Sequence, residues 1–308
     1  MNFDLTPEER ELQQWVRELC ARENPIEQLR ANAGKLDRGA WGALWEAGVF
    51  SIVTPGEGDV ATGFKDAVLV FEELGRALVP GPLVGTINSR DGTAAGAMER
   101  TARVVDHLES LDVLQVIDDE GLWLVTELSE VEAEPIEEPL DPLTPQHRVR
   151  SAPQGQLLAG PESAARRRIE GATLTAAMQV GIAARCTELA VAYAKEREQF
   201  GVPIGSFQAV KHICADMLVR AEVARAAVHA AGVMVDDPSA GDPARAAAAA
   251  KVVADDAAFR NGKDCVQVHG GMGFTWEVDV HLYLKRAAVL SQQFGTVGEH
   301  AERMFAWL

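Results

Sequence analysis

More than any other feature, a long helical pattern over the second half of the sequence limits the folds open to this chain. Arg166 to Glu196 forms one alanine-rich segment, which the glycines and proline of Gly201 to Gly205 interrupt. Hydrophobic residues make up 47% of the chain and aromatic residues only 6%, so small and aliphatic side chains dominate. Such side chains let helices pack closely. The pattern predicts a C-terminal helical bundle of three or four helices over residues 163–308.

Capping signals place the other helices of this bundle. Ser206 is expected to cap a second helix, and the pair Asp242-Pro243 is expected to open a third. Gly270 and Gly271 are typical of a C-terminal stop for that third helix. Two shorter helices are predicted to finish the chain.

The first hundred residues also have a helical pattern. Thr6 is followed by Pro7 and Glu9, which is the signature of a capped helix start. Further helices are predicted around 40–47 and 64–78. We expect an N-terminal helical domain over residues 1–102.

Between these helical regions, the sequence changes character. Val113 to Ile117 and Leu122 to Val125 are short apolar runs on either side of Asp118 to Gly121, which predicts a β-hairpin. Acidic residues and prolines dominate from Glu127 to Pro145. We expect a reduced central β segment over 103–162, within a mainly α fold.

Charge and composition exclude several functions. A net charge of −17 makes a nucleic-acid partner improbable, because binding the phosphate backbone needs a basic surface. No apolar run approaches the length that spans a membrane, and no signal peptide is recognisable, so we expect a cytoplasmic protein. The four cysteines form no C-x-x-C pair, and no zinc site, other metal site or disulfide framework is expected.

Two short motifs carry the chemical information. The first, R-x-Q-F-G-x-P-I, contains Arg197, Gln199, Phe200 and Ile204, and an arginine is well suited to grip a pyrophosphate with two hydrogen bonds. An arginine at a helix end is more often only a favourable charge for the helix dipole. The second motif, Q-x-x-G-G-x-G-F, begins at Gln267, and its glycines allow a ligand close to the backbone or simply end a helix. Each motif alone is weak.

Together, in this order and spacing, the motifs resemble the C-terminal domain of acyl-CoA dehydrogenases. The resemblance implies an N-terminal helical domain, a central β-domain and a C-terminal four-helix bundle, in an oligomer with FAD at the subunit interface. It implies contacts with the nucleotide half of a neighbour's FAD for these residues: Arg197, Gln199, Phe200, Ile204, Gln267, Gly270 and Gly271. Thr296 matches the threonine of the family's E-G-T motif, and would approach FAD on the other side of the interface.

The sequence departs from the family pattern where the catalytic base is expected. Phe294 stands where the E-G-T motif has its glutamate, and Gly171 stands where other members carry the base on the long helix. Glu170 is one residue away, which is about 100° around a helix, and a solvated carboxylate beside neighbouring arginines is the simpler interpretation. No catalytic residue is therefore assigned. The family's T-E-P-x-A-G-S-D and W-I-T motifs, which hold the flavin ring, have no counterpart between Arg103 and Pro161.

Three hypotheses follow from the resemblance. The chain is similar to short subunits of the α2β2 acyl-CoA dehydrogenases of steroid-degrading bacteria, which implies a longer acyl-CoA dehydrogenase paralogue as partner in a heterotetramer. The substrate would then be an acyl-CoA, for example one with a steroid side chain, and the acceptor an electron-transfer flavoprotein or a similar protein. The alternatives are an autonomous homo-oligomeric oxidoreductase with a relocated base, and a non-enzymatic acyl-CoA-binding or scaffold protein.

Overall fold

The computed structural model of this chain describes residues 5–32, 34–53, 63–87 and 92–305. Its helices are α1 (Pro7–Glu23), α2 (Ile26–Asn32), α3 (Arg38–Glu46), α4 (Phe64–Arg76), α5 (Leu83–Thr86), α6 (Pro161–Glu196), α7 (Gln208–Asp236), α8 (Pro243–His269), α9 (Val280–Leu290) and α10 (Val297–Phe305). Its strands are β1 (Ala95–Glu99), β2 (Val104–Asp106), β3 (Val113–Ile117), β4 (Leu122–Val125), β5 (Glu132–Pro135), β6 (Gln146–Ser151), β7 (Gln156–Ala159), β8 (Glu198–Gln199) and β9 (Val202–Pro203).

The first N-terminal helix, α1, begins where its capping signal predicted. The Thr6 N–H donates to Glu9 Oε2 at 2.8 Å, and the Glu9 N–H donates to Thr6 Oγ1 at 3.2 Å, which is a reciprocal capping box at the start of α1. The helices predicted around 40–47 and 64–78 are α3 and α4. The helical prediction for this region is confirmed.

Two glycines allow α4 to cross α6 with their backbones in contact. A Cβ atom on Gly75 would lie 2.2 Å from the Met178 carbonyl oxygen, and one on Gly181 would lie 1.9 Å from the Glu72 carbonyl oxygen. No other residue could occupy either position without separating the helices. Consequently the N-terminal helices and the C-terminal bundle share one continuous hydrophobic core.

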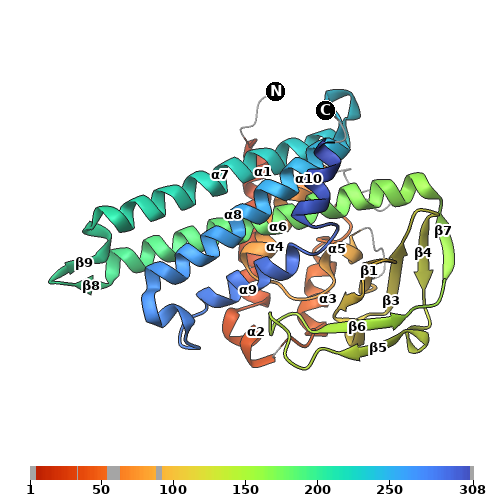
Figure 1. Cartoon of the computed structure of the whole chain (residues 1–308), viewed down its shortest axis with the longest axis horizontal. Helices are drawn as coiled ribbons and strands as arrows, with labels where there is room; N and C mark the ends of the chain where they lie inside the picture. Colours follow the sequence, from red (N-terminus) through yellow and green to blue (C-terminus); the bar gives the residue numbers. More distant parts are fainter. Residues whose placement is uncertain (1–4, 33, 54–62, 88–91, 306–308) are drawn as a thin grey trace.

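The C-terminal bundle is built on α6, which runs almost the whole length of the molecule (Figure 1). Asp242 caps α8 as predicted, since its Oδ1 accepts from the Ala244 N–H at 2.9 Å. The prediction for Ser206 is wrong: α7 starts at Gln208, and the Ser206 hydroxyl donates to the Pro203 carbonyl at 2.7 Å instead. A single turn of 3₁₀ helix over Ile204–Ser206 occupies the place of the expected cap.

The β segment forms two small sheets with a core of their own. One sheet has the strand order β1-β3-β4-β7 and the other β2-β6-β5. The predicted hairpin is β3 paired antiparallel with β4, with Ile117 opposite Leu122. The first strand begins at Ala95, before the boundary expected at residue 103, and its partner β3 runs parallel to it. Eight buried side chains, among them Leu114, Val125 and Val149, form the separate core.

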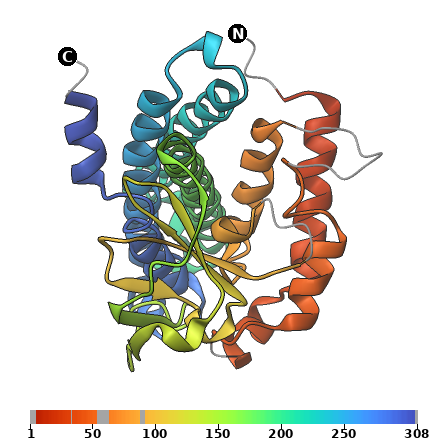
Figure 2. The same ribbon diagram turned by 90° about the vertical axis from the view of Figure 1, so that its right-hand side faces the viewer.

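The two sheets lie at one end of the long bundle, beside the N-terminal end of α6 (Figures 1 and 2). The opposite end of α6 carries the short hairpin β8–β9. In the part of the chain that the structure describes, no helix is long and apolar enough to cross a membrane.

Candidate functional site

The first motif forms a hairpin that projects from the end of the bundle. Gln199 pairs with Val202, which leaves Phe200 and Gly201 as a two-residue turn with φ of +55° and +78°. Positive φ at both positions is the geometry of a tight hairpin turn, which Asn-Gly usually occupies. A phenylalanine there is strained, and Phe200 is also 93% exposed. A strained, exposed aromatic ring of this kind is available to contact a ligand or a partner.

Two polar residues of this hairpin, Arg197 and Gln199, are exposed to solvent. Arg197 is exposed, and its guanidinium makes no hydrogen bond or ion pair with any residue that the structure describes. Gln199 is also exposed, and its side-chain N–H donates to the Glu198 carbonyl at 2.8 Å. Ile204 has another role. It is partly buried against the core, and its N–H donates to the Arg197 carbonyl at 2.7 Å, which closes the base of the hairpin.

The second motif lies at the same end of the bundle. Gly270 ends α8 with φ of +61°, and a Cβ atom on Gly270 or Gly271 would meet no atom within 4 Å. Their backbone is therefore open to a ligand. His269 stacks on Tyr193 of α6 with ring centroids 4.2 Å apart, and this contact joins the ends of α8 and α6. Gln267 is exposed on the last turn of α8.

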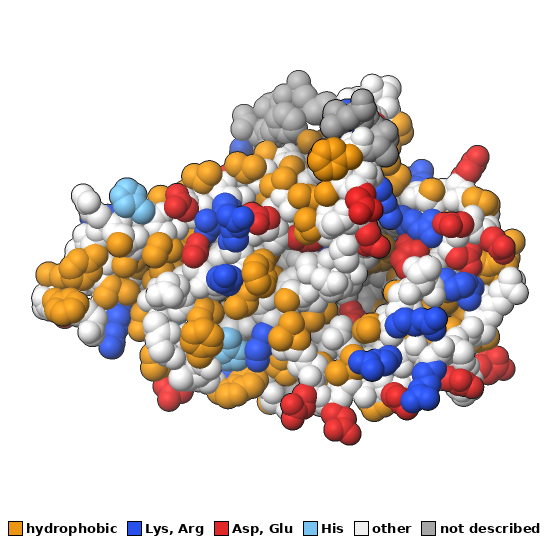
Figure 3. Space-filling model, in the orientation of Figure 1, with side chains coloured by type: hydrophobic (Ala, Val, Ile, Leu, Met, Phe, Trp, Pro, Cys, Tyr) orange, Lys and Arg blue, Asp and Glu red, His pale blue; other side chains and the backbone are white. Residues whose placement is uncertain are grey.

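Exposed apolar side chains surround both motifs. They gather at the left-hand end of the molecule in Figure 3. We call this surface the apolar end and define it by Phe200, Val202, Phe207, Met272 and Phe274. Phe274 is 78% exposed, and the ring of Phe200 lies edge-on to that of Phe207 at 6.2 Å. Contiguous exposed apolar surface of this kind is typical of an interface.

Thr296 lies far from these two motifs. It caps α10, where its hydroxyl and its N–H both donate to Glu299 Oε2, at 3.0 and 2.7 Å. Phe294, two residues before Thr296, packs against Gly171 in the N-terminal third of α6. Because each helical residue adds about 1.5 Å, the stretch of α6 from there to the hairpin is about 38 Å long. The structure thus brings seven of the eight predicted cofactor-binding residues to one end of the bundle and leaves Thr296 near the other.

The two positions at which a catalytic base was sought are in direct contact. The Phe294 ring covers Gly171 so closely that a Cβ atom on the glycine would lie 2.2 Å from the ring. Phe294 has φ of +54°, which is strained for an aromatic residue, and its carbonyl accepts a hydrogen bond from His300 Nε2 at 3.0 Å. Burial lowers the pKa of His300 to about 4, so the ring is neutral and can donate from this nitrogen. Neither position carries a carboxylate. The Phe294 ring lies against Gly171 and occupies the space where a catalytic carboxylate was expected.

Glu170 is not the solvated carboxylate that the sequence suggested. It is buried, and its Oε1 accepts from Arg166 Nε at 2.8 Å. Arg167 is buried beside it and donates to the Val84 carbonyl at 2.6 Å. The sequence analysis was right that arginines neighbour Glu170, but its prediction that Glu170 is exposed to solvent is wrong. A helix that is covered along most of its length leaves few solvated positions, and only the packing reveals this.

A cleft of about 1060 Å³ opens between the sheets and the helices, next to Phe294. Met98, Ile169, Ala247 and Leu290 contribute to its apolar lining, and charged side chains of both signs surround its recess in Figure 3. One lining residue, Asp106, was not identified from the sequence. Asp106 has a pKa raised by burial, and its two oxygens accept hydrogen bonds from the amides of Gln146 and Gln293. No sequence signal marks it, because its environment is made by segments distant in the chain.

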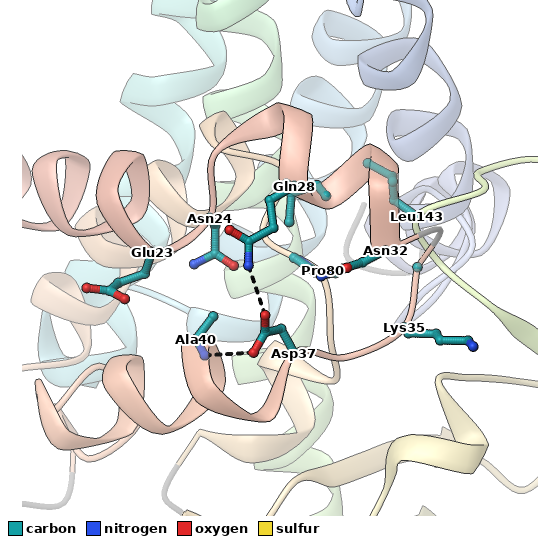
Figure 4. Close-up of a pocket in the computed structure, with 11 residues that line it drawn as sticks. Glu23, Asn24, Gln28, Asn32, Lys35, Asp37, Ala40, Pro80 and Leu143 are labelled. Carbon is teal, nitrogen blue, oxygen red and sulfur yellow. Dashed lines mark hydrogen bonds between the residues drawn. The ribbon is translucent and has the colours of Figure 1, made fainter.

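A second hollow, between α1, α2 and α3, has a volume of only about 10 Å³ (Figure 4). Asp37 accepts there from the Gln28 side chain at 2.9 Å and from the Ala40 N–H at 3.2 Å. The hollow has room for about one water molecule, and Asp37, its acidic side chain beside Gln28, is engaged in capping α3. It is a structural feature.

Comparison with known proteins places this architecture in a family. Residues 6–100 match the model of the acyl-CoA dehydrogenase N-terminal domain, and residues 162–306 match that of the C-terminal domain. Acyl-CoA dehydrogenase IpdE2 of Mycobacterium tuberculosis is 35% identical over 306 residues, which cover 91% of each chain.

Two solved structures have the same fold. The Tcur3481–Tcur3483 steroid ACAD is similar with a TM-score of 0.85 at 24% identity, covering 97% of both chains. The ChsE4–ChsE5 complex from Mycobacterium tuberculosis is similar with a TM-score of 0.84 at 21% identity, covering 99% of this chain and 98% of that chain. The mainly α fold inferred from the sequence is thus confirmed, and the chain belongs to the acyl-CoA dehydrogenase family.

Proposed function

We propose that this chain is the short subunit of a heteromeric, FAD-dependent acyl-CoA dehydrogenase and completes the FAD site of a longer paralogue. The reaction would be the α,β-dehydrogenation of an acyl-CoA thioester. One observation carries the proposal: the free Arg197 and the open glycine backbone lie about 38 Å along α6 from Thr296 and Phe294. Groups so far apart cannot hold one dinucleotide together. The hairpin end is therefore available to a neighbour's cofactor.

The residues of the hairpin end fit the nucleotide half of FAD. Arg197 would pair with the pyrophosphate through two hydrogen bonds, and the unhindered backbone at Gly270 and Gly271 would approach the same group. Phe200 would stack on the adenine. Gln199 and Gln267 would donate from their amides, Ile204 would hold the hairpin in place, and Thr296 would face the cofactor across the other interface. FAD, when bound, supplies the hydride acceptor of the dehydrogenation.

Catalysis is assigned to the partner because this chain offers no base at the expected place. Abstraction of the α-proton of an acyl-CoA needs a group that accepts a proton within hydrogen-bond reach. Phe294 and Gly171 supply hydrocarbon there, and Glu170 is held in an ion pair with Arg166. We therefore assign no catalytic residue to this chain.

The names of the similar structures support a heteromeric assembly and a steroid substrate. ChsE4–ChsE5 is a complex of two different chains, and the Tcur3481–Tcur3483 structure is called a steroid ACAD. We propose a heterotetramer of two short and two long chains that acts on an acyl-CoA with a bulky, steroid-like acyl group. An electron-transfer flavoprotein or a similar protein would accept the electrons. The apolar end is the surface that association with the long chain would cover.

Asp106 is the observation that favours the autonomous alternative. It lines the cleft, burial raises its pKa, and it accepts a hydrogen bond from Gln293, the residue that precedes Phe294. Both of its oxygens already accept hydrogen bonds, which makes it a poorly available base. The heteromeric subunit remains the better supported function.

The proposal is tested by expressing this chain alone and together with a longer acyl-CoA dehydrogenase. Co-expression is expected to give a stable complex of both chains, flavin absorbance and acyl-CoA dehydrogenation, whereas the lone chain is expected to be colourless and inactive. Retention of FAD with turnover by the lone chain would establish the autonomous alternative. A complex that contains neither flavin nor activity would favour the alternative of a non-enzymatic scaffold protein.

Arg197→Ala in the co-expressed complex tests the hairpin directly. Loss of the guanidinium removes a charged, bidentate hydrogen-bond donor, and we expect at least a tenfold weaker retention of FAD during dialysis, about 1.4 kcal/mol. Arg22→Ala is the control, because Arg22 is also exposed but lies on α1 and pairs with Glu23. Equal flavin content in both variants would refute the role of Arg197.

A further inference from the structure

An aromatic stack joins the two helices that carry the motifs. Tyr193 of α6 lies on His269 of α8, with ring centroids 4.2 Å apart and an angle of 22° between the ring planes. We propose that these two rings are positioning residues for the FAD site, because they fix the spacing between Arg197 and the turn Gly270–Phe274, which we call the glycine turn. The inference rests on the function proposed above, in which both segments grip one pyrophosphate.

Tyr193 is tied to the hairpin through the backbone of α6. Its carbonyl accepts the Arg197 N–H at 2.8 Å, so the arginine follows directly on the last turn of the helix. Gly205, just after the hairpin, lies against the same turn, since a Cβ atom there would be 2.8 Å from the Ala194 carbonyl oxygen. A displacement of Tyr193 is therefore expected to carry the hairpin with it.

His269 is tied to the glycine turn in the same way. It is the last residue of α8, and Gly270 follows it directly. A Cβ atom on Gly273 would lie 2.7 Å from the Val266 carbonyl oxygen, which shows that the turn folds back onto the last turn of α8. The position of the glycine turn therefore depends on the position of this helix end.

The imidazole ring of His269 is held in one orientation. Its Nδ1 lies 2.8 Å from the Cys265 carbonyl oxygen, and because a carbonyl oxygen only accepts hydrogen bonds, this nitrogen donates. The Cys265 sulfur lies 3.9 Å from the same nitrogen. The ring is also buried, so it has little freedom to turn away from Tyr193.

The stack lies where the two helices would otherwise have most freedom. Asn261 of α8 donates to the Ala183 carbonyl at 3.1 Å and to Thr187 Oγ1 at 3.2 Å, which links α8 to α6. This link is about 12 Å along α8 from His269. Helix ends fray more readily than helix centres, and the stack holds the two ends together beyond the asparagine.

Spacing matters because the two segments would share one ligand group. An N–H···O hydrogen bond is about 2.7–3.2 Å long, so a relative shift of about 1 Å between Arg197 and the glycine turn would break one set of bonds. Fixing the spacing before the ligand arrives lowers the entropic cost of binding. In the described part of the chain the Tyr193 hydroxyl makes no hydrogen bond, so the ring itself provides the contact.

Release of FAD from the complex with the longer paralogue tests the positioning role. Tyr193→Ala removes the stack, and we expect FAD to dissociate about fivefold faster on dilution, measured by flavin fluorescence. Tyr193→Phe keeps the ring and is expected to behave as the parent. Leu12→Ala is the control, because Leu12 is also partly buried but lies on α1. Equal release from Tyr193→Ala and Leu12→Ala, or faster release from Tyr193→Phe, would overturn the proposal.

A double-mutant cycle shows whether Tyr193 acts through Arg197. If it does, Tyr193→Ala changes the release rate by less than about twofold in the Arg197→Ala complex, because the spacing no longer matters once one donor is gone. His269→Ala is expected to reproduce the effect of Tyr193→Ala, and the two together are expected to be no worse than either alone. A full fivefold effect of Tyr193→Ala without the arginine would overturn the positioning role.

Hydrogen exchange in the lone chain separates this inference from the proposed function. We expect Tyr193→Ala to accelerate amide exchange in residues 198–203 and in the glycine turn, and Tyr193→Phe and Leu12→Ala to leave it unchanged. Unchanged exchange in either segment, or equal acceleration throughout the chain, would overturn the positioning role. If the parent complex holds no FAD, the proposed function fails, and the exchange measurement decides the positioning role by itself.

Discussion

At the scale of single residues, backbone strain marks two of the positions on which the proposed function rests. Phe200 and Phe294 both have positive φ, which is costly for an aromatic side chain. Phe200 is exposed on the hairpin, whereas Phe294 is wedged between Gly171 and His300. Strain that persists in a fold is compensated by its surroundings. The sequence showed both residues but gave no sign of their backbone conformation.

The contact between Phe294 and Gly171 predicts the effect of adding a single methyl group. Gly171→Ala would place its Cβ 2.2 Å from the ring, so the ring must move, and we expect destabilisation by about 1–3 kcal/mol. Gly42→Ala on α3 meets no atom within 4 Å and is expected to stabilise by about 0.5–1 kcal/mol. Urea unfolding measures both. In Gly171→Ala with Phe294→Gly the clash is removed, and failure of this rescue would contradict the contact.

His107 predicts a pH dependence of stability. Burial, with Arg286 nearby, lowers its pKa in the folded protein from 6.5 to about 3. As pH falls below 6.5, the unfolded chain binds a proton here that the folded chain excludes, so the free energy of unfolding decreases. At pH 5 this decrease is about 2 kcal/mol.

The substitution His107→Asn isolates that contribution. Asparagine does not titrate and tolerates the φ of +55° at this position. Between pH 7 and pH 5, the free energy of unfolding measured in urea is expected to fall by about 2 kcal/mol less in the variant than in the parent protein. Equal losses in the two proteins would show that His107 is not the group responsible.

At the scale of elements, the crossing of α4 and α6 joins the two helical regions. Gly181→Ala would direct its Cβ at a backbone carbonyl, Glu72 O, at 1.9 Å, and a backbone cannot rotate away as a side chain can. We expect destabilisation by about 3 kcal/mol or more, measured by urea unfolding, with Gly42→Ala as the control. If Gly181→Ala destabilised the protein less than Gly171→Ala, the prediction would be wrong, because α4 and α6 could then separate at little cost in free energy.

At the scale of the whole molecule, the apolar end is expected to serve assembly rather than folding. Phe200→Ser removes a side chain that is 93% exposed, so the free energy of unfolding of the lone chain should change by no more than about 0.5 kcal/mol. Association with the partner should weaken, with a loss of flavin. Leu140→Ser, which alters an exposed side chain of the β segment, is the control. Native mass and flavin absorbance measure the outcome, and equal assembly of both variants would exclude the apolar end as the interface.

The sequence by itself determined the elements and the family. The Thr6 capping box, the Asp242 cap and the hairpin of β3 and β4 depend on residues close in the chain, and local hydrogen bonding is enough to specify them. The sequence motifs likewise identified an acyl-CoA dehydrogenase, because their order and spacing are read directly from the chain.

Only the tertiary structure decided how these parts meet. Gly171 and Phe294 are far apart in the sequence, yet the fold presses one onto the other, and the cleft with Asp106 is enclosed by strands and helices from different regions. The burial of Glu170 and the start of β1 at Ala95 have the same origin. Burial and contact depend on packing between distant segments, which a local pattern does not encode.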